Sequence, residues 1–219
     1  MSLMLLCPPG VYRAEGDTAL LADVMDRGGF ALGRRVLDVG TGSGALAVAA
    51  ARAGAATVTA VDLSWRSVAA TWFNGRLHGA MVSVRRGDLF AAVAGRRFDL
   101  VIANPPYVPA ETAVLPRHRK ARSWDAGPDG RAVLDRICAG LTDVLAPGGD
   151  VLLVHSAVCN ADVTLGALGR AGLTSQVLAR VSVPFGPVMR ARAAMLESRG
   201  LIAPGQRVEE LVVVGGTWQ

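Results

Sequence analysis

The chain has 219 residues, of which 51% are hydrophobic and 19% are charged. This size and composition predict one globular domain over 1–219, long enough to bury a substantial core, with a helical lead-in at 1–33 and a core region at 34–219. The formal net charge is +5, yet Lys120 is the only lysine among the 23 basic residues. A coding bias towards arginine explains such a balance as well as an acidic partner does, so charge alone selects no function.

Several classes of protein are disfavoured by what the chain lacks. Arg52 interrupts the longest apolar stretch, so no transmembrane helix is expected. The N-terminus shows no signal-peptide pattern, and three scattered cysteines suit reduced thiols, so a cytoplasmic location is expected. The histidines do not cluster with the cysteines at ligand spacing, and no metal site is predicted.

Strands and helices are predicted to alternate along the chain. A short amphipathic helix is expected at 17–27, before the first strand. β-Branched runs predict strands at 35–40, 57–62, 81–86, 98–103, 150–155, 174–183 and 209–214. Helical spacing predicts further helices at 43–53, 65–78, 130–145, 161–171 and 188–199, with Pro147-Gly148-Gly149 as a stop signal. This alternation predicts an α/β fold whose mostly parallel sheet carries helices on both faces, with an antiparallel final strand beside the sixth.

A glycine-rich segment, Asp38-Val39-Gly40-Thr41-Gly42-Ser43-Gly44, joins the first predicted strand to the next helix. Glycines allow a tight turn and a close approach of the backbone to a ligand. The N–H groups that begin the helix favour a negative group. The Gly-x-Gly-x-Gly spacing differs from that of dinucleotide-binding proteins, and its compactness favours a carboxylate-bearing ligand over a pyrophosphate.

Acidic residues close the next two predicted strands. Asp62 ends the second strand, where its carboxylate can accept hydrogen bonds from both hydroxyls of a ribose. Asp88 follows the third strand and can accept a hydrogen bond from the amine of an adenine. Either residue alone is often structural, but ligands of open α/β sheets bind at the carboxyl ends of strands. Together with the glycine loop, these positions indicate an adenosine-containing ligand.

Asn104-Pro105-Pro106-Tyr107 directly follows the fourth predicted strand. The prolines fix the backbone, and the first holds Asn104 outside the helical region. The Asn104 side-chain oxygen and the Pro105 carbonyl can accept both hydrogens of a planar NH₂ group, on which Tyr107 can stack. Two such acceptors would orient a poorly nucleophilic nitrogen, so that alignment and electrostatics supply the catalysis. A stiff turn that merely ends the strand is the alternative.

These motifs resemble class I, Rossmann-like S-adenosylmethionine-dependent methyltransferases over residues 35–107. Over about 10–155 the chain resembles the HemK/PrmC family, which methylates the glutamine amide of peptide-chain release factors. That closer resemblance depends on Val108-Pro109 after the tetrapeptide, on Val11-Tyr12-Arg13 ahead of Asp17-Thr18, and on the segment 124–130 (WDAGPDG). It implies the sheet order 3-2-1-4-5-7-6 with the seventh strand antiparallel.

The resemblance also implies the site residues. Catalysis would fall to Asn104, Pro105, Pro106 and Tyr107. S-adenosyl-L-methionine would be bound by the lead-in, the glycine loop and the ends of three strands, namely Asp17, Thr18, Asp38, Gly40, Thr41, Gly42, Gly44, Asp62, Leu63, Asp88, Leu89 and Asn104.

The chain departs from this family in places. It lacks the N-terminal helical domain of the bacterial enzymes and is closer in length to archaeal and eukaryotic relatives, which use a small zinc-bearing activator subunit. Gly16 stands where those relatives have Glu, and nothing from Val183 onward matches the pattern. The run Arg117-His118-Arg119-Lys120-Ala121-Arg122 suits phosphate contacts or plain solvation.

The expected acceptor is the glutamine amide of a protein such as a release factor. Two alternatives stay open at this point. One is methylation of an exocyclic amine of RNA or DNA, although no segment is large enough for a DNA-recognition domain. The other is a non-catalytic subunit that binds the cofactor, against which the intact Asp38, Asp62 and Asn104 argue.

Overall fold

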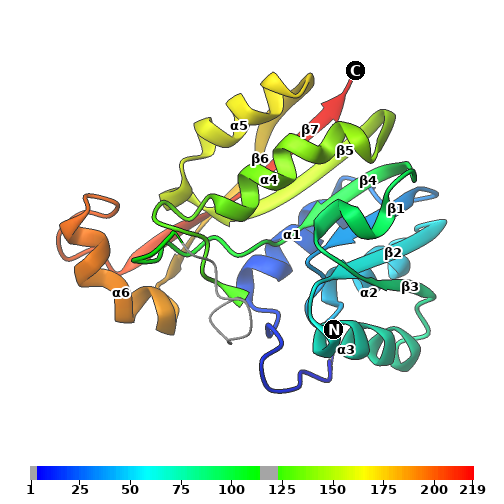
Figure 1. Cartoon of the computed structure of the whole chain (residues 1–219), viewed down its shortest axis with the longest axis horizontal. Coiled ribbons are helices and arrows are strands. Elements are labelled where there is room, and N and C mark those ends of the chain that lie inside the picture. Colours follow the sequence, from blue (N-terminus) through cyan, green and yellow to red (C-terminus); the bar gives the residue numbers. More distant parts are fainter. Residues whose placement is uncertain (1–3, 114–122) are drawn as a thin grey trace.

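The structure is a computed structural model that describes residues 4–113 and 123–219 (Figure 1). One sheet contains β1 (Arg35–Val39), β2 (Thr57–Asp62), β3 (Val82–Arg86), β4 (Phe98–Ala103), β5 (Leu145–Ser156), β6 (Leu173–Pro184) and β7 (Val208–Trp218). The strand order is β3-β2-β1-β4-β5-β7-β6. Strands β1 to β5 pair in parallel, whereas β7 runs antiparallel to both β5 and β6. The predicted fold and strand order are confirmed.

Helices cover both faces of the sheet. On one face α1 (Gly16–Arg27) and α2 (Ala45–Arg52) bury Leu21, Met25 and Leu46 against the sheet, with α3 (Trp65–Leu77) beside β2 and β3. On the other face, α4 (Ala132–Gly140), α5 (Ala161–Arg170) and the 3-10 turn η1 (Leu89–Val93) pack Ile137 and Leu168 against it. Helices α1, α2, α4 and α5 bury apolar side chains against the sheet, as amphipathic helices do, whereas α3 buries mainly small and polar residues. Within the described residues, no helix is long and apolar enough to cross a membrane.

The start of β5 differs from the prediction. The helix expected at 130–145 ends at Gly140, is followed by the 3-10 turn η3 (Leu141–Asp143), and gives way to β5 at Leu145. Pro147-Gly148-Gly149 therefore lies inside the strand. The pairing with β4 shifts register between Phe98 and Leu100 at this point, and Gly148 has a φ of +72°. Such an irregularity lets a proline and a positive φ sit within a strand without ending it.

The segment between β6 and β7 carries α6 (Pro187–Ser198), away from the body of the sheet (Figure 1). Its apolar side forms a small cluster with the chain that follows β4, where Phe185, Met189 and Leu196 surround Val108. Arg192 donates hydrogen bonds from Nη1 to the Pro109 carbonyl (2.9 Å) and from Nη2 to the Asp125 carboxylate (2.5 Å). The connection thus supports the loop that carries Asn104-Pro105-Pro106-Tyr107.

Candidate active site

The glycine loop follows β1 at the carboxyl edge of the sheet. Gly44 begins α2 with a φ of +84°, and a Cβ there would lie 2.9 Å from the Thr71 side chain, so only glycine fits without displacement. The Asp62 carboxylate accepts hydrogen bonds from the Gly42 N–H (3.0 Å) and the Ser64 N–H (2.8 Å). Asp62 therefore fixes the conformation of the loop as well as standing at the end of β2.

Asp38 is buried beneath this loop. Its Oδ2 accepts a hydrogen bond from the Thr41 hydroxyl (2.6 Å), while its Oδ1 is buried without a hydrogen-bond partner. Burial raises the pKa of Asp38 to about 7, and the Thr41 hydrogen bond opposes that shift. An unsatisfied buried carboxyl oxygen is a place for a ligand donor. The ammonium group of the methionine part of S-adenosylmethionine has the donors and the charge that this position suits.

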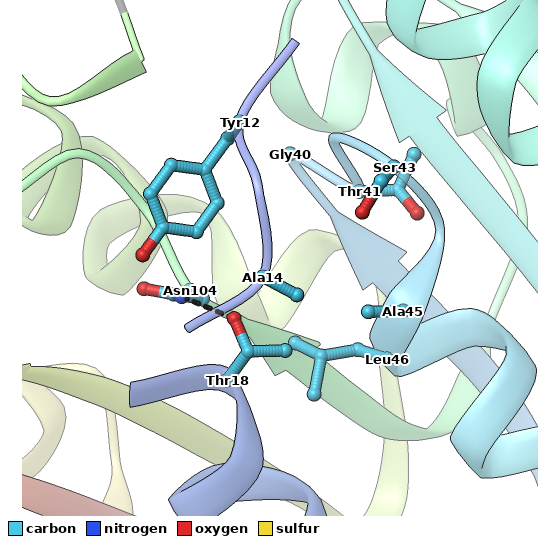
Figure 2. Close-up of a pocket in the computed structure, with 9 residues that line it drawn as sticks. All are labelled: Tyr12, Ala14, Thr18, Gly40, Thr41, Ser43, Ala45, Leu46 and Asn104. Carbon is cyan, nitrogen blue, oxygen red and sulfur yellow. Dashed lines mark hydrogen bonds between the residues drawn. The ribbon is translucent and has the colours of Figure 1, made fainter. Parts of the chain in front are cut away.

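A cavity connects the glycine loop with the acceptor segment (Figure 2). Four predicted residues line it together: Thr18, Gly40, Thr41 and Asn104. Sequence reasoning did not single out its other lining residues, which are Tyr12, Ala14, Ser43, Ala45 and Leu46. Tyr12 could have been identified from the sequence, because it lies in the Val11-Tyr12-Arg13 stretch on which the family resemblance partly depends. Ala14 precedes α1, Ser43 lies in the glycine loop, and Ala45 and Leu46 begin α2.

The Asn104 side chain is oriented by α1. Its Nδ2 donates a hydrogen bond to the Thr18 hydroxyl (3.0 Å), which turns the Oδ1 atom away from the helix (Figure 2). The residue is half-buried at the end of β4, and Pro105, behind it, is buried. A fixed amide with its oxygen directed away from Thr18 is suited to accept an N–H from a substrate.

Asp17 joins three elements at the acceptor side of the site. Its carboxylate accepts hydrogen bonds from the hydroxyls of Tyr12 (2.7 Å) and Tyr107 (2.9 Å) and from the Thr18 N–H (2.6 Å). Burial, with the charge of Asp17 as the next cause, raises the pKa of both tyrosines, so both phenols stay protonated and donate. Asp17 was predicted among the cofactor-binding residues; the contacts place it against the tyrosine of the acceptor segment.

The remaining predicted residues lie farther along the strand ends. Asp88 is exposed and forms an ion pair with Arg136 of α4 (2.7 Å). Leu89 has a φ of +47°, which is uncommon for a residue other than glycine, and Leu63 is half-buried after Asp62. Their contact with the adenosine part of the cofactor stays a prediction. The basic run at 117–122 falls outside the described residues.

The last histidine of the chain, His155, lies near the end of β5. It is fully buried on β5, and its Nδ1 atom lies 2.9 Å from the Ser156 carbonyl. Burial lowers the pKa of His155 to about 4, so the ring is neutral. His155 lies two residues from Leu153, which packs in the core beneath α4 and α5, so it is a core residue and not a site residue.

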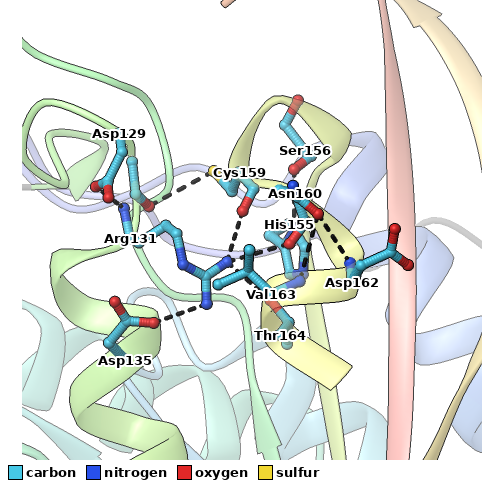
Figure 3. Close-up of polar contacts among 11 residues, drawn as sticks. Asp129, Arg131, Asp135, His155, Ser156, Cys159, Asn160, Asp162, Val163 and Thr164 are labelled. Carbon is cyan, nitrogen blue, oxygen red and sulfur yellow. Dashed lines mark hydrogen bonds and ion pairs between the residues drawn. The ribbon is translucent and has the colours of Figure 1, made fainter. Parts of the chain in front are cut away.

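A buried arginine supports the acceptor segment from behind (Figure 3). Arg131 donates hydrogen bonds to the Cys159 carbonyl (2.5 Å) and the Thr164 hydroxyl (3.0 Å), and it forms an ion pair with Asp135 (2.7 Å). The Cys159 thiol in turn donates to the Tyr107 carbonyl (3.0 Å). These bonds tie the start of α4 to the turn after β5 and hold the Tyr107 backbone between them.

Comparisons with known proteins agree with this geometry. The family model described as methyltransferase small domain matches residues 3–117. A Methanocaldococcus jannaschii protein assigned as a protein N5-glutamine methyltransferase is 32% identical over 182 residues, which cover 83% of this chain and 90% of the relative. The release factor glutamine methyltransferase of Bordetella pertussis is 39% identical over 67% of this chain, which spans only 57% of that longer relative.

Among solved structures, the E. cuniculi Mtq2–Trm112 complex, described as responsible for methylation of the eRF1 translation termination factor, is similar with a TM-score of 0.65. It is 22% identical, and the match covers 96% of this chain and 99% of that chain. At this identity the likeness concerns the fold. The family match and the archaeal relative establish the membership: this chain belongs to the S-adenosylmethionine-dependent methyltransferases, within the HemK/PrmC-like protein N5-glutamine methyltransferase family.

Proposed function

We propose that this protein methylates the side-chain amide nitrogen of a glutamine in a protein substrate, and that a peptide-chain release factor is that substrate. The observation that carries the proposal is the Asn104 amide, oriented by Thr18 in the same cavity as the glycine loop. Relatives named for glutamine methylation of release factors or of ribosomal protein uL3 support the choice of acceptor.

The residues of the chain account for the positioning that the reaction needs. S-adenosylmethionine supplies a methyl group on a positively charged sulfur, and in this proposal Asp38, the glycine loop and Asp62 hold the cofactor. Asn104 Oδ1 and the Pro105 carbonyl accept the two N–H groups of the glutamine amide, which fixes the direction of the nitrogen lone pair. Tyr107, held by Asp17 through its hydroxyl, presents its ring to the amide plane. Alignment and electrostatics then lower the barrier without a strong base.

The charges of the acceptor side favour a protein over a nucleic acid. Asp17 is buried there, and Glu209 of β7 lies within electrostatic range of it. Two carboxyl groups at the acceptor side disfavour a phosphate and favour N–H donors. Methylation of an exocyclic amine of RNA remains the competing proposal, and a label-transfer experiment separates the two. Labelled methyl groups recovered in protease-sensitive, ribonuclease-resistant material would support glutamine, and the reverse pattern would contradict it.

Replacing Asn104 tests the mechanism directly. Asn104→Ala is expected to lower kcat for release-factor methylation by about a hundredfold or more, as loss of an aligned polar group at a reacting centre does. The affinity for S-adenosylmethionine, measured by calorimetry, should change little. Asn160→Ala is a matched control, because Asn160 caps α5 through its side chain, away from the cavity. An Asn104→Ala enzyme with the wild-type kcat would remove this residue from the mechanism.

We also propose that a small protein subunit binds the face formed by α3 and β3. Trp65, Trp72 and Met81 expose 64%, 51% and 92% of their surface there, which is unusual for side chains of this size. Trp65 and Trp72 line an apolar groove of about 540 Å³ together with Phe73, Val84 and Leu6. Met81 directly precedes β3, the strand that contributes Val84. β3 forms one edge of the sheet, so its backbone groups can pair with an added strand. The related Mtq2–Trm112 structure, a two-protein complex, supports the proposal.

Arginines set the charge expected of that subunit. The Arg86 guanidinium lies 4.9 Å from the centre of the Trp65 ring, and that of Arg76 lies 4.5 Å from the centre of the Trp72 ring. Cations stacked on exposed aromatic rings make a rim that attracts carboxylates. The subunit therefore presents an apolar centre surrounded by acidic residues.

A further inference from the structure

Glu209 is a buried acid to which the proposed mechanism assigns no contact with the substrate. It is the second residue of β7 and is only 6% exposed. Side chains alternate along a strand, and Val213 packs in the core beneath α1 and α2, so Glu209 faces α1 as well. Ser156 of β5 pairs with Leu211 and shares this face. Glu209 therefore lies at the carboxyl edge of the sheet, on the side of α1 and the acceptor segment.

Its neighbours belong to the acceptor side of the site. The pKa of Glu209 is raised, chiefly by burial and also by the charge of Asp17, while a hydrogen bond with the Ser156 side chain opposes this shift. The charge of Glu209 contributes in turn to the raised pKa of Tyr107. Glu209 is thus within electrostatic range of both Asp17 and the tyrosine of the acceptor segment.

The carboxyl group is incompletely satisfied. Oε2 of Glu209 is buried and has no hydrogen-bond partner among the described residues. An unpaired buried carboxyl oxygen is costly, and a native protein that retains one commonly uses it. The same condition holds for Oδ1 of Asp38 beneath the cofactor loop. The two carboxyl groups differ in position. Asp38 lies on β1 beneath the glycine loop, whereas Glu209 lies on β7 at the acceptor side of the site.

We propose that Glu209 is a substrate-contacting residue whose carboxylate accepts an N–H donor from the backbone that flanks the target glutamine. This inference rests on the proposed function. Asn104 follows β4, and β5 separates β4 from β7, so Glu209 is at least two strand spacings, or roughly 10 Å, from the amide clamp. That separation suits the peptide backbone next to the glutamine and not its amide.

The chemistry of the neighbourhood restricts the donor. Asp17 already accepts hydrogen bonds from Tyr12 and Tyr107, so it offers the substrate less than Glu209 does. A phosphate would be repelled by both carboxyl groups, whereas a peptide N–H is neutral and donates one hydrogen bond. A change of the Glu209 side-chain rotamer would redirect Oε2 and would leave the β7 backbone in place.

The test compares Glu209→Leu and Glu209→Gln with Glu210→Gln. Glu210 is the matched control because it is the next residue, on the opposite face, paired with Arg180 near the surface. With a recombinant release factor as substrate, Glu209→Leu should raise KM about ten- to a hundredfold, the effect of losing a charged acceptor. Glu209→Gln keeps an amide oxygen and should have a smaller effect, and Glu210→Gln should have none.

Three readouts separate this role from a structural one. The affinity for S-adenosylmethionine should stay at the wild-type value, and the melting temperature of Glu209→Leu should equal or exceed that of the wild type, because an unpaired buried carboxyl is removed. A lower melting temperature with unchanged KM would overturn the inference in favour of a structural acid. Glu209→Gln supplies the same comparison if Glu209→Leu does not fold.

The wild-type enzyme separates failure of this inference from failure of the proposed function. Absence of methyl transfer to the release factor by the wild type would overturn the proposed function itself. Normal transfer by the wild type with an unaltered KM in the variants would overturn only the role of Glu209.

Discussion

Asp38 is a carboxyl group that changes its charge near neutral pH. Burial raises its pKa from 3.8 to about 7, so about half of the molecules carry the neutral acid at that pH. The folded protein without ligand binds this proton more tightly than the unfolded chain does. The contribution of Asp38 to stability is therefore complete below about pH 3.8 and is lost as the pH rises through about 7. Binding a ligand ammonium requires the opposite, ionised form.

Two opposite pH dependences are expected from this one residue. The affinity for S-adenosylmethionine should rise between about pH 6 and about pH 8, by up to tenfold per pH unit below the pKa. Over the same range the ligand-free protein should lose stability. Calorimetric titration and thermal melting at several pH values measure the two effects. Asp38→Asn should weaken binding and remove most of both slopes; slopes retained in that variant would contradict the assignment to Asp38.

Asp17 shows how one side chain links recognition of different groups. It orders Tyr12 from the lead-in, Thr18 from α1 and Tyr107 from the acceptor segment. Thr18 in turn orients Asn104. The acceptor clamp is therefore built partly by the segment before β1, which explains why the Val11-Tyr12-Arg13 stretch and Asp17-Thr18 accompany Asn104-Pro105-Pro106-Tyr107 in the chain.

At the level of elements, the acceptor segment depends on close contact with the turn before α4. Gly130 has a φ of +76°, and a Cβ there would lie 2.3 Å from the Tyr107 carbonyl oxygen and 2.7 Å from the Cys159 sulfur. Neither neighbour can retreat easily, because Val108 N–H is bonded to the Trp124 carbonyl (2.8 Å) and Cys159 is buried. The position of Tyr107 is thus set by the absence of a side chain at 130.

Gly130→Ala should displace the acceptor segment while leaving the cofactor loop intact. We expect kcat to fall about tenfold or more, because a shift of about 1 Å at a reacting group has effects of this size or larger. Gly79→Ala is the matched control: Gly79 has a φ of +65°, and a Cβ there meets nothing within 4 Å. Both variants carry the backbone strain of a positive φ, so only Gly130→Ala adds the clash. Equal kcat values for the two would show that the contact with Tyr107 is unimportant.

Features of the site that depend on residues close together in the sequence could be predicted, whereas contacts between distant segments could not. The positions of Asp62 and Asn104 at strand ends could be predicted, because strand patterns, glycine spacing and proline stiffness act on neighbouring residues. The hydrogen bond between Tyr12 and Asp17 and the electrostatic effect of Asp17 on Glu209 could not be predicted, since they depend on how the lead-in and β7 pack around α1. The contacts of α6 with Pro109 and Asp125 lie in the same class.

The extent of the elements was predicted less well where backbone context overrides local preference. Pro147-Gly148-Gly149 is a typical breaker, yet the strand partner Phe98 pairs with Leu145 before the irregularity and draws the segment into β5. The sheet order itself was predicted through the family resemblance. Alternation of strands and helices gave only the class of fold, because it does not determine which strands are neighbours.

At the scale of the whole molecule, cofactor and acceptor residues gather along the carboxyl edge of the parallel strands, while the apolar face of α3 and β3 lies beyond β2 at the end of the sheet (Figure 1). A subunit on that face would contact the strand next to Asp62 without covering Asn104. The subunit would therefore affect catalysis by changing how the cofactor is bound near Asp62, and not by contacting the acceptor. The rigid sheet allows this, because β3 pairs with β2 along its length, including Asp62 with Arg86.

Polar, uncharged substitutions on that face test the whole-molecule proposal. In Trp72→Gln/Met81→Gln the apolar centre becomes polar while the charge of the face is unchanged, and the isolated double variant should self-associate less than the wild type in sedimentation experiments, since a large exposed patch is lost. When the protein is purified from its native cells, the wild type should retain a stoichiometric acidic subunit that raises its methylation rate, and the double variant should not.

Leu32→Lys is the control for that experiment, because Leu32 is 70% exposed but lies after α1, outside the groove. It should retain both the subunit and the rate. Intrinsic binding of S-adenosylmethionine should persist in the double variant, since none of its changes touches the glycine loop or Asp38. A wild type that purifies alone and works at full rate would contradict the proposal of a subunit, and loss of the subunit in Leu32→Lys would place its binding surface elsewhere.

The salt dependence of binding tests the contribution of the arginines on this face. A subunit attracted by Arg76 and Arg86 should dissociate as salt is raised, whereas a subunit bound through the apolar groove alone should not.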